Sequence, residues 1–311
     1  MRASLPEFAF RRVRWMIGDR SPLVAYLKVT QRCNLDCEYC PWHTSAGNFA
    51  GELSTSHWRR VIAQLASEGV RVFVLEGGEP TLRHDLPDLL NAVAGSGSIS
   101  ILATNAITPP WRFAASAFTV SVDGPREVHD QVRGKGSYDR LQRSLATRDD
   151  RSVVAIVVVS RRNRHCLRET VEGVASSVDA VLFTFEYPYK GVITNVLSPR
   201  DLAETKTDIL RLKDDFNILN PSSRLIADPG VLPCHDWLAI SVDHAGTIRA
   251  GCFVQHVEPK RCDECELGCF QVISSFYEFQ LEAWLQFSNL LLRRKTGERE
   301  RRLSSDLNCN S

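Results

Sequence analysis

Six short runs of β-branched and other apolar residues lie between residues 24 and 185, separated by polar turns and amphipathic stretches. This alternation predicts a parallel sheet with right-handed crossover helices, an α/β fold. The predicted strands are 24–29, 70–75, 99–103, 118–122, 153–159 and 180–185. The predicted helices are 56–67, 85–94, 137–146, 167–176 and 199–216.

The length of the alternating region limits the barrel that it can form. A complete eight-stranded β/α barrel takes roughly 250 residues, whereas only residues 23–220 precede a second group of cysteines. Six strands in this length predict a partial (β/α)6 TIM-like barrel followed by a small C-terminal Cys-rich module that holds a hairpin at 237–249. The expected organisation is an N-terminal extension (1–22), the partial barrel (23–220), the Cys-rich module (221–273) and a C-terminal helix and tail (274–311).

Composition and charge exclude several classes of protein. The 311 residues carry a net charge of +1, so no nucleic-acid-binding or membrane surface is expected. The longest aliphatic run, 153–159, is too short to span a bilayer, and no signal peptide follows the first arginines, which predicts a cytoplasmic protein. Ten cysteines in that compartment indicate metal or redox chemistry rather than disulfides.

Three cysteines, Cys33, Cys37 and Cys40, lie within eight residues after the first predicted strand. A four-iron cluster takes four ligands, so three thiolates leave one iron open to an exogenous ligand. Such a site is reactive. A zinc site with His43 as a fourth ligand is the alternative.

The cysteine spacing, with the aromatic Tyr39 before the last cysteine, resembles the signature of the radical S-adenosylmethionine (SAM) enzymes. The resemblance implies a SAM-binding 4Fe-4S cluster that a flavodoxin- or ferredoxin-type reductant reduces. A Gly-Gly-Glu-Pro turn after the second predicted strand carries a further resemblance, which implies that Gly77, Gly78 and Glu79 hold the amino group of SAM. Glycines suit this role because they let the backbone approach a ligand closely.

Polar residues also follow the third and fourth predicted strands, where parallel sheets gather functional groups. Thr104 and Asn105 end the third strand, and Ser121 and Asp123 end the fourth, with Arg133 shortly after. This pattern is similar to that of radical SAM enzymes with auxiliary clusters, which implies that Ser121 and Arg133 bind the ribose and carboxylate of SAM. An ion pair between Asp123 and Arg133 that only stabilises the loop remains an alternative.

A second group of five cysteines resembles the twitch or truncated SPASM module of radical SAM enzymes, which implies a second, auxiliary 4Fe-4S cluster. Its members are Cys234, Cys252, Cys262, Cys265 and Cys269. We favour the first four as ligands and expect Cys269 to be an alternative ligand or a thiol that returns a hydrogen atom to a substrate radical. A four-cysteine zinc site has the same ligand types and stays open.

One departure from the family concerns the general base. In the sulfatase-maturing relatives an aspartate follows the second cysteine of this module and acts as base, whereas Phe253 follows Cys252 here. A base must then come from elsewhere in the chain. The candidates are Glu186, Tyr187, His235 and Asp236.

The resemblance implies a 5'-deoxyadenosyl radical that abstracts hydrogen from a substrate C–H bond. The expected reaction is oxidation or dehydrogenation of a sugar-like or other natural-product precursor. A ribosomal-peptide maturase or an epimerase of the same superfamily is the alternative. The peptide is the less favoured substrate because the predicted barrel begins by residue 23, with no room for a separate N-terminal peptide-recognition domain. A non-enzymatic zinc or electron-transfer protein is the alternative from another class.

Overall fold

The structure is a computed structural model that describes residues 5–41, 51–189, 194–256, 262 and 265–286. The strands are β1 (Val24–Thr30), β2 (Val72–Gly77), β3 (Ile99–Thr104), β4 (Ala117–Ser121), β5 (Val153–Val159), β6 (Ala180–Phe185), β7 (Ala239–Val242) and β8 (Ile248–Ala250). The helices are α1 (Leu5–Met16), α3 (Thr55–Ser67), α4 (Leu86–Gly95), α5 (Arg126–Arg133), α6 (Ser137–Leu145), α7 (Leu167–Glu172), α8 (Pro199–Leu212), α9 (Ser222–Ile226) and α10 (Gly268–Tyr277). None of the helices in these ranges combines the length and apolarity needed to span a bilayer.

These strands form one parallel-dominated sheet in the order β6-β5-β4-β3-β2-β1-β7-β8. Strands β1 to β6 pair in parallel in their sequence order, which confirms the predicted α/β fold. The predicted hairpin is also confirmed as β7 and β8, and β7 continues the sheet by pairing in parallel with β1. The C-terminal ends of the parallel strands therefore lie along one edge of the sheet.

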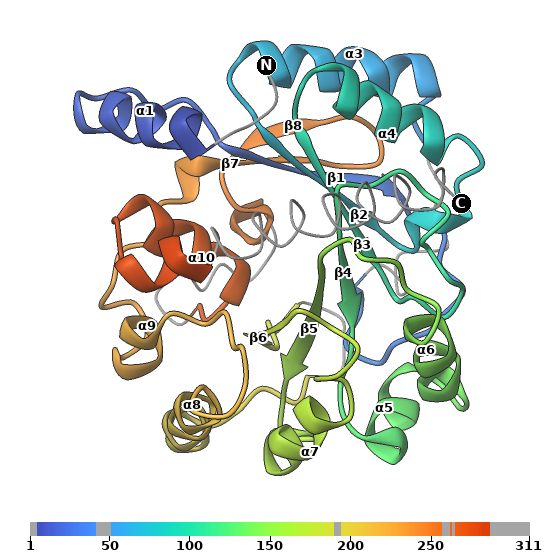
Figure 1. The fold of residues 1–311 in the computed structure, drawn as a ribbon, viewed down its shortest axis with the longest axis vertical. Helices are drawn as coiled ribbons and strands as arrows, with labels where there is room; N and C mark the ends of the chain where they lie inside the picture. Colours follow the sequence, from blue (N-terminus) through green and yellow to red (C-terminus); the bar gives the residue numbers. More distant parts are fainter. Residues whose placement is uncertain (1–4, 42–50, 190–193, 257–261, 263–264, 287–311) are drawn as a thin grey trace, which may run out of the picture.

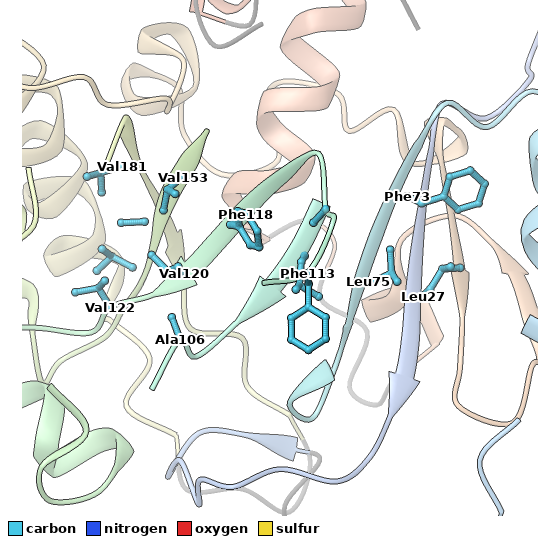
Figure 2. Packing of buried hydrophobic residues seen from close by; sticks show 14 of the residues in the cluster. Leu27, Phe73, Leu75, Ala106, Phe113, Phe118, Val120, Val122, Val153 and Val181 are labelled. Carbon is cyan, nitrogen blue, oxygen red and sulfur yellow. The ribbon is translucent and has the colours of Figure 1, made fainter. Parts of the chain in front are cut away.

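One face of the sheet packs against helices that surround it (Figure 1). Alternate residues of β1, including Leu27, share a buried core with Trp58 of α3 and Leu89 of α4. Figure 2 shows how this core continues through Phe118 of β4 and Val153 of β5. Each such fully buried side chain contributes roughly 1.5–3 kcal/mol to folding, so burial on this face stabilises the sheet.

The opposite face of the sheet packs against the C-terminal part of the chain. Tyr26 of β1 lies on this face, with its ring 5.2 Å from that of Phe270 in α10. Beyond it, the Trp15 ring of α1 lies 5.8 Å from Trp237 and 5.4 Å from Tyr277. The aromatic contacts tie the N-terminal helix and the C-terminal cysteine region to the same face.

Several segments differ from the sequence prediction: no helix was expected at α1 or α9, and α7 and α8 end four residues before their predicted limits. Residues 126–133, to which no helix was assigned, form α5, with Pro125 before the first turn and Gly134 after the last at φ +102°. Helix α10 begins at Gly268, ahead of the expected start at 274, so the expected boundary at 273 falls inside a helix. The predicted tail beyond residue 286 lies outside the described residues.

Candidate active site

The Gly-Gly-Glu-Pro turn lies directly against the start of the cysteine loop. The amide of Gly78 donates to the carbonyl oxygen of Thr30 at 2.7 Å, and the amide of Glu79 donates to that of Arg32 at 2.7 Å. A Cβ atom on Gly77, whose φ is +137°, would lie 2.2 Å from the Thr30 oxygen, and one on Gly78 would lie 2.2 Å from the Arg32 oxygen. Both glycines are therefore required by the backbone of the loop itself.

The Glu79 carboxylate is buried and joins the ends of β2 and β3. Its Oε1 accepts hydrogen bonds from the Thr81 hydroxyl at 2.7 Å and the Thr104 hydroxyl at 2.8 Å. Its Oε2 accepts from the Asn105 amide at 2.8 Å. The Asn105 side chain in turn donates to Asn34 Oδ1, inside the cysteine loop, at 2.8 Å. Thr104 and Asn105 thus connect this turn to the loop.

The three thiols of the first cysteine group lie in a partly buried loop. Cys33 is exposed, Cys40 is half-buried and Cys37 is buried. Burial is the main cause that raises the pKa of Cys37 to about 11; Arg133 opposes it, and Asp123, Cys40 and Cys33 contribute to the rise. Burial is also the main cause of the raised pKa of Cys33, with Cys40 contributing. The three sulfur atoms therefore act on one another electrostatically.

Arg133 forms a buried ion pair with Asp123 rather than facing open solvent. Arg133 Nε donates to Asp123 Oδ2 at 2.5 Å, and the Tyr39 hydroxyl donates to the same oxygen at 3.0 Å. Arg133 Nη2 donates to the Tyr39 hydroxyl at 2.5 Å, and Nη1 lies 3.9 Å from Cys37 Sγ. The alternative of a loop-stabilising ion pair thus describes this geometry, and binding of the SAM carboxylate stays a prediction.

His129 and Asp130, which precede Arg133 on α5, have separate structural roles. His129 is 1% exposed, and its Nδ1 accepts from the backbone amide of Asp123 at 3.3 Å. Burial lowers the pKa of His129 to about 4, so the ring is neutral at neutral pH. Asp130 accepts from the backbone amides of Gly136 and Tyr138, at the start of α6. His129 therefore stabilises the backbone at Asp123, and Asp130 stabilises the first turn of α6.

Three cysteines of the second group, Cys252, Cys265 and Cys269, pack with Tyr26 and Phe270 on the face of the sheet opposite the α3 and α4 core. Burial raises the pKa of Cys265 to about 12, with Cys234 and Cys262 adding to it. It also raises the pKa of Cys269 to about 12, with contributions from Glu76 and Cys265. Burial raises that of Cys252 still further, helped by Cys269 and Cys265. Cys269 is also hydrogen-bonded to the buried Tyr26 hydroxyl.

Both cysteine groups supply thiols, which can ligate either an iron–sulfur cluster or a zinc ion. A four-iron cluster takes one thiolate on each of several irons, so its ligands stand farther apart than around one zinc ion. Thiolate is the usual protein ligand of such clusters.

The base candidates lie in different places. Glu186 and Tyr187 follow β6 and line a small pocket that includes Cys265, and burial raises the pKa of Glu186. His235 Nε2 lies 3.1 Å from Glu278 Oε1, and Asp236 begins a short 3-10 turn; neither residue lines that pocket. Ser121 is the half-buried last residue of β4. The structure therefore groups only Glu186 and Tyr187.

Sequence reasoning missed an ion pair inside the sheet. Lys28 Nζ lies 2.9 Å from Glu76 Oε1, the two residues pair across β1 and β2, and Lys28 is 7% exposed. The ammonium group also lies 4.4 Å from the centre of the Phe253 ring, next to Cys252. The signal was available, because each is a charged residue at the end of an otherwise apolar strand.

A second missed residue fixes the end of β1. The buried guanidinium of Arg83 donates to the carbonyl oxygen of Val29 at 2.6 Å and pairs with Asp85 at 2.7 Å. Its Nη2 also donates to the Leu53 carbonyl oxygen at 3.2 Å. Both charged residues follow the Gly-Gly-Glu-Pro turn in the sequence, so their place beside a motif was the available signal.

Residues 27–174 match the family model of the radical SAM superfamily. The chain therefore contains a radical SAM superfamily domain, which includes the first cysteine group and the Gly-Gly-Glu-Pro turn.

Several characterised proteins resemble part of the chain. The Fe-coproporphyrin III synthase of Methanosarcina barkeri is 37% identical over 135 residues, which are 41% of this chain and 34% of that protein. The PqqA peptide cyclase of Rhodopseudomonas palustris is 34% identical over 51% of this chain and 45% of its own length. The mycofactocin maturase MftC of Mycobacterium tuberculosis is 34% identical over 47% of this chain and 40% of its own length. The chain thus matches a third to a half of these relatives.

Solved structures extend the likeness to most of the fold. Streptococcus suis SuiB bound to S-adenosylmethionine superposes with a TM-score of 0.61 over 90% of this chain and 72% of its own, at 14% identity. The structure of anSMEcpe with bound AdoMet gives a TM-score of 0.59 over 84% of this chain and 82% of its own, at 16% identity. At these identities the likeness concerns the fold alone.

Proposed function

We propose that this protein is a radical SAM enzyme that cleaves SAM reductively and uses the 5'-deoxyadenosyl radical to oxidise a precursor. The observation that carries the proposal is the radical SAM domain, in which three thiols share one loop beside the Gly-Gly-Glu-Pro turn. When bound, a 4Fe-4S cluster and SAM supply the radical chemistry. The residues of this chain would bind and orient the cluster, SAM and the substrate.

Cys33, Cys37 and Cys40 would hold the SAM-binding cluster. The amides of Gly78 and Glu79 hold the turn against the loop backbone. Because an ammonium group only donates, we infer that carbonyl oxygens of the turn accept hydrogen bonds from the amino group of SAM. The half-buried hydroxyl of Ser121 at the same strand edge suits the ribose.

We further propose that the sheet is a partial barrel with a twitch- or SPASM-like module on its inner face. Four thiolates of the second group would hold an auxiliary cluster, with Cys234, Cys252, Cys262 and Cys265 as the favoured set. The mutual electrostatic effects among these thiols support a shared site. Cys269 stays an alternative ligand or a hydrogen donor, and zinc stays the competing metal.

The substrate is proposed to lie between the two cysteine groups, beside the pair of Lys28 and Glu76. The Lys28 ammonium group lies close to the Phe253 ring. In the sequence, Lys28 precedes the cysteine loop and Glu76 precedes the Gly-Gly-Glu-Pro turn. Burying a charged pair on a mostly apolar sheet face costs desolvation free energy. A role in binding or activating a polar substrate would explain why the pair is there. Glu76 therefore joins Glu186 and Tyr187 as a candidate base.

A peptide is the first candidate substrate, ahead of the sugar-like precursor that the sequence suggested. The names of two relatives, a peptide cyclase and a maturase, favour it, as does the likeness in fold to SuiB, which has been solved with its precursor peptide SuiA. A tetrapyrrole is the second candidate, favoured by the Fe-coproporphyrin III synthase. Oxidation stays the proposed reaction for either candidate, and epimerisation stays the alternative outcome.

Metal analysis of the anaerobically reconstituted chain tests the enzyme class. With both sites filled, about eight irons per chain are expected, and replacing Cys33, Cys37 and Cys40 by Ala should leave about four. With dithionite and SAM, the wild type should release 5'-deoxyadenosine and the triple variant should not. The Cys166→Ala variant, at a buried thiol outside both groups, is the matched control and should keep all iron. A colourless zinc protein, or full iron in the triple variant, would refute the proposal.

A further inference from the structure

Arg133 points all three of its guanidinium nitrogens into the cysteine loop and its partner carboxylate. Nε donates to Asp123, Nη2 donates to the Tyr39 hydroxyl, and Nη1 approaches Cys37 Sγ at 3.9 Å. The side chain is only 8% exposed. A guanidinium this deeply buried is stable only when its donors are paired, and each nitrogen here has a partner.

The partner carboxylate is itself held from several elements. Tyr39 donates to Asp123 Oδ2 at 3.0 Å, and the backbone amide of Val158 in β5 lies 3.3 Å from Oδ1. The side chain of Asn163 donates to the backbone carbonyl of Asp123 at 2.9 Å, and His129 accepts from its amide. Asp123 cannot move without breaking these bonds, so the direction of Arg133 toward Cys37 is fixed.

The loop is also fastened to the helix that carries Arg133. The backbone amide of Glu38 donates to the carbonyl oxygen of Val132, the residue before Arg133, at 3.2 Å. The Glu38 carboxylate also pairs with Arg162, after β5, at 2.5 Å. The distance between the guanidinium and the Cys37 sulfur is therefore constrained by the backbone contact at Val132 and by the ion pair that holds Glu38.

We propose that Arg133 is a positioning residue that donates an N–H group to the Cys37 sulfur and thereby raises the reduction potential of a cluster on this loop. The inference rests on the proposed function, because it requires that Cys33, Cys37 and Cys40 hold the cluster. Hydrogen bonds to ligating sulfurs and nearby charge tune such potentials. Reduction adds negative charge, which a cationic donor stabilises. This role differs from binding of the SAM carboxylate, which the sequence suggests for the same residue.

The experiment compares the reduction potential of the SAM-free cluster between the wild type and two variants, each as the reconstituted full chain. The potential is measured by redox titration followed by electron paramagnetic resonance. Lysine retains a charge for Asp123 but not the planar fork that reaches Tyr39 and Cys37 together, so Arg133→Lys should shift the potential to more negative values. Asp123→Asn keeps an oxygen acceptor while leaving the guanidinium charge uncompensated, so it should shift the potential to more positive values. If the Arg133–Asp123 pair only stabilised the loop, the two variants would not shift the reduction potential in opposite directions.

The matched control is Arg126→Lys, on the same helix, where an exposed arginine pairs with Asp139; its potential should equal that of the wild type. An unchanged potential in both Arg133→Lys and Asp123→Asn, or loss of iron from both, would overturn the inference. If only one of the two variants retains iron, the sign of its potential shift decides. The expected sign supports the inference, and the opposite sign overturns it. If SAM affinity falls in Arg133→Lys while the potential is unchanged, the SAM-carboxylate role stands instead. A wild-type chain without a cluster would refute the proposed function itself.

Discussion

A single hydrogen atom at Gly78 determines how closely two functional segments approach. Because a Cβ atom there would lie 2.2 Å from the Arg32 carbonyl oxygen, Gly78→Ala must displace the start of the cysteine loop. We expect the variant to retain less iron at the first site and to bind SAM more weakly, with an unchanged circular dichroism spectrum. Iron analysis and equilibrium dialysis with labelled SAM measure both effects.

Gly95→Ala is the control for this substitution, because nothing lies within 4 Å of the added methyl group at the end of α4. Alanine is the better helix former, so iron content and SAM binding should stay at wild-type levels. Full iron retention in Gly78→Ala would mean that the loop adjusts freely, contrary to the contacts described.

His129 makes the stability of the protein depend on pH. Its pKa is about 4 in the folded state against 6.5 as the ordinary value, because burial disfavours the charged ring. Between these values the unfolded chain binds more protons, so stability is full above pH 6.5 and falls as the pH drops towards 4. The loss should reach roughly 3 kcal/mol at pH 4.

Urea unfolding of the apoprotein at pH 7.5, 5.5 and 4.5 tests this, with His129→Gln as the comparison. Glutamine retains an oxygen that can accept from the Asp123 amide but does not titrate in this range. The variant should lose less stability than the wild type between pH 7.5 and 4.5. Parallel losses in the two proteins would assign the pH dependence to other groups.

At the scale of elements, a buried ion pair attaches the second cysteine group to α8. Lys206 Nζ lies 2.9 Å from Glu266 Oε1, beside Cys265, and donates to the Ala227 carbonyl oxygen at 2.6 Å. Both side chains are at most 5% exposed. Lys206→Met leaves a buried carboxylate without its counter-charge and should cost about 3–5 kcal/mol in the free energy of unfolding.

The comparison is Arg200→Ala on the same helix, which removes an exposed pair with Glu204. Solvent screens that pair, so no measurable change in urea unfolding is expected. A loss in Lys206→Met no larger than in Arg200→Ala would show that α8 does not hold the cysteine segment. Iron analysis of the same variant reports whether the second site depends on this attachment.

At the scale of the whole molecule, the two cysteine groups come from opposite ends of the described chain yet face one sheet. If they hold separate clusters, replacing Cys252 and Cys265 by Ala should remove about four irons and leave the other four. Reductive cleavage of SAM should persist, because the first group is the one proposed to hold the SAM-binding cluster. Loss of all iron, or of SAM cleavage, would show that the two sites are not independent.

Local patterns were sufficient to predict the elements and the two cysteine groups. All six predicted barrel strands appear within two residues of their expected limits, because each is a short apolar run bounded by turn residues. The cysteine loop was recognisable from its spacing, and the Gly-Gly-Glu-Pro turn from its resemblance to a radical SAM motif and its place after a predicted strand. Helix α5 was not predicted, since its sequence is mostly charged and its only apolar residues are Val128 and Val132.

Which groups meet was decided only by the tertiary structure. Asp123 and Arg133 are ten residues apart in the sequence. Tyr39, which is hydrogen-bonded to both, lies in the cysteine loop that follows β1. Lys28 meets Glu76 because parallel pairing aligns their strands. Sequence determined the residue types and periodicities, since these depend on near neighbours along the chain. Partners from distant segments depend on strand order and register, which only the packing of the whole core specifies.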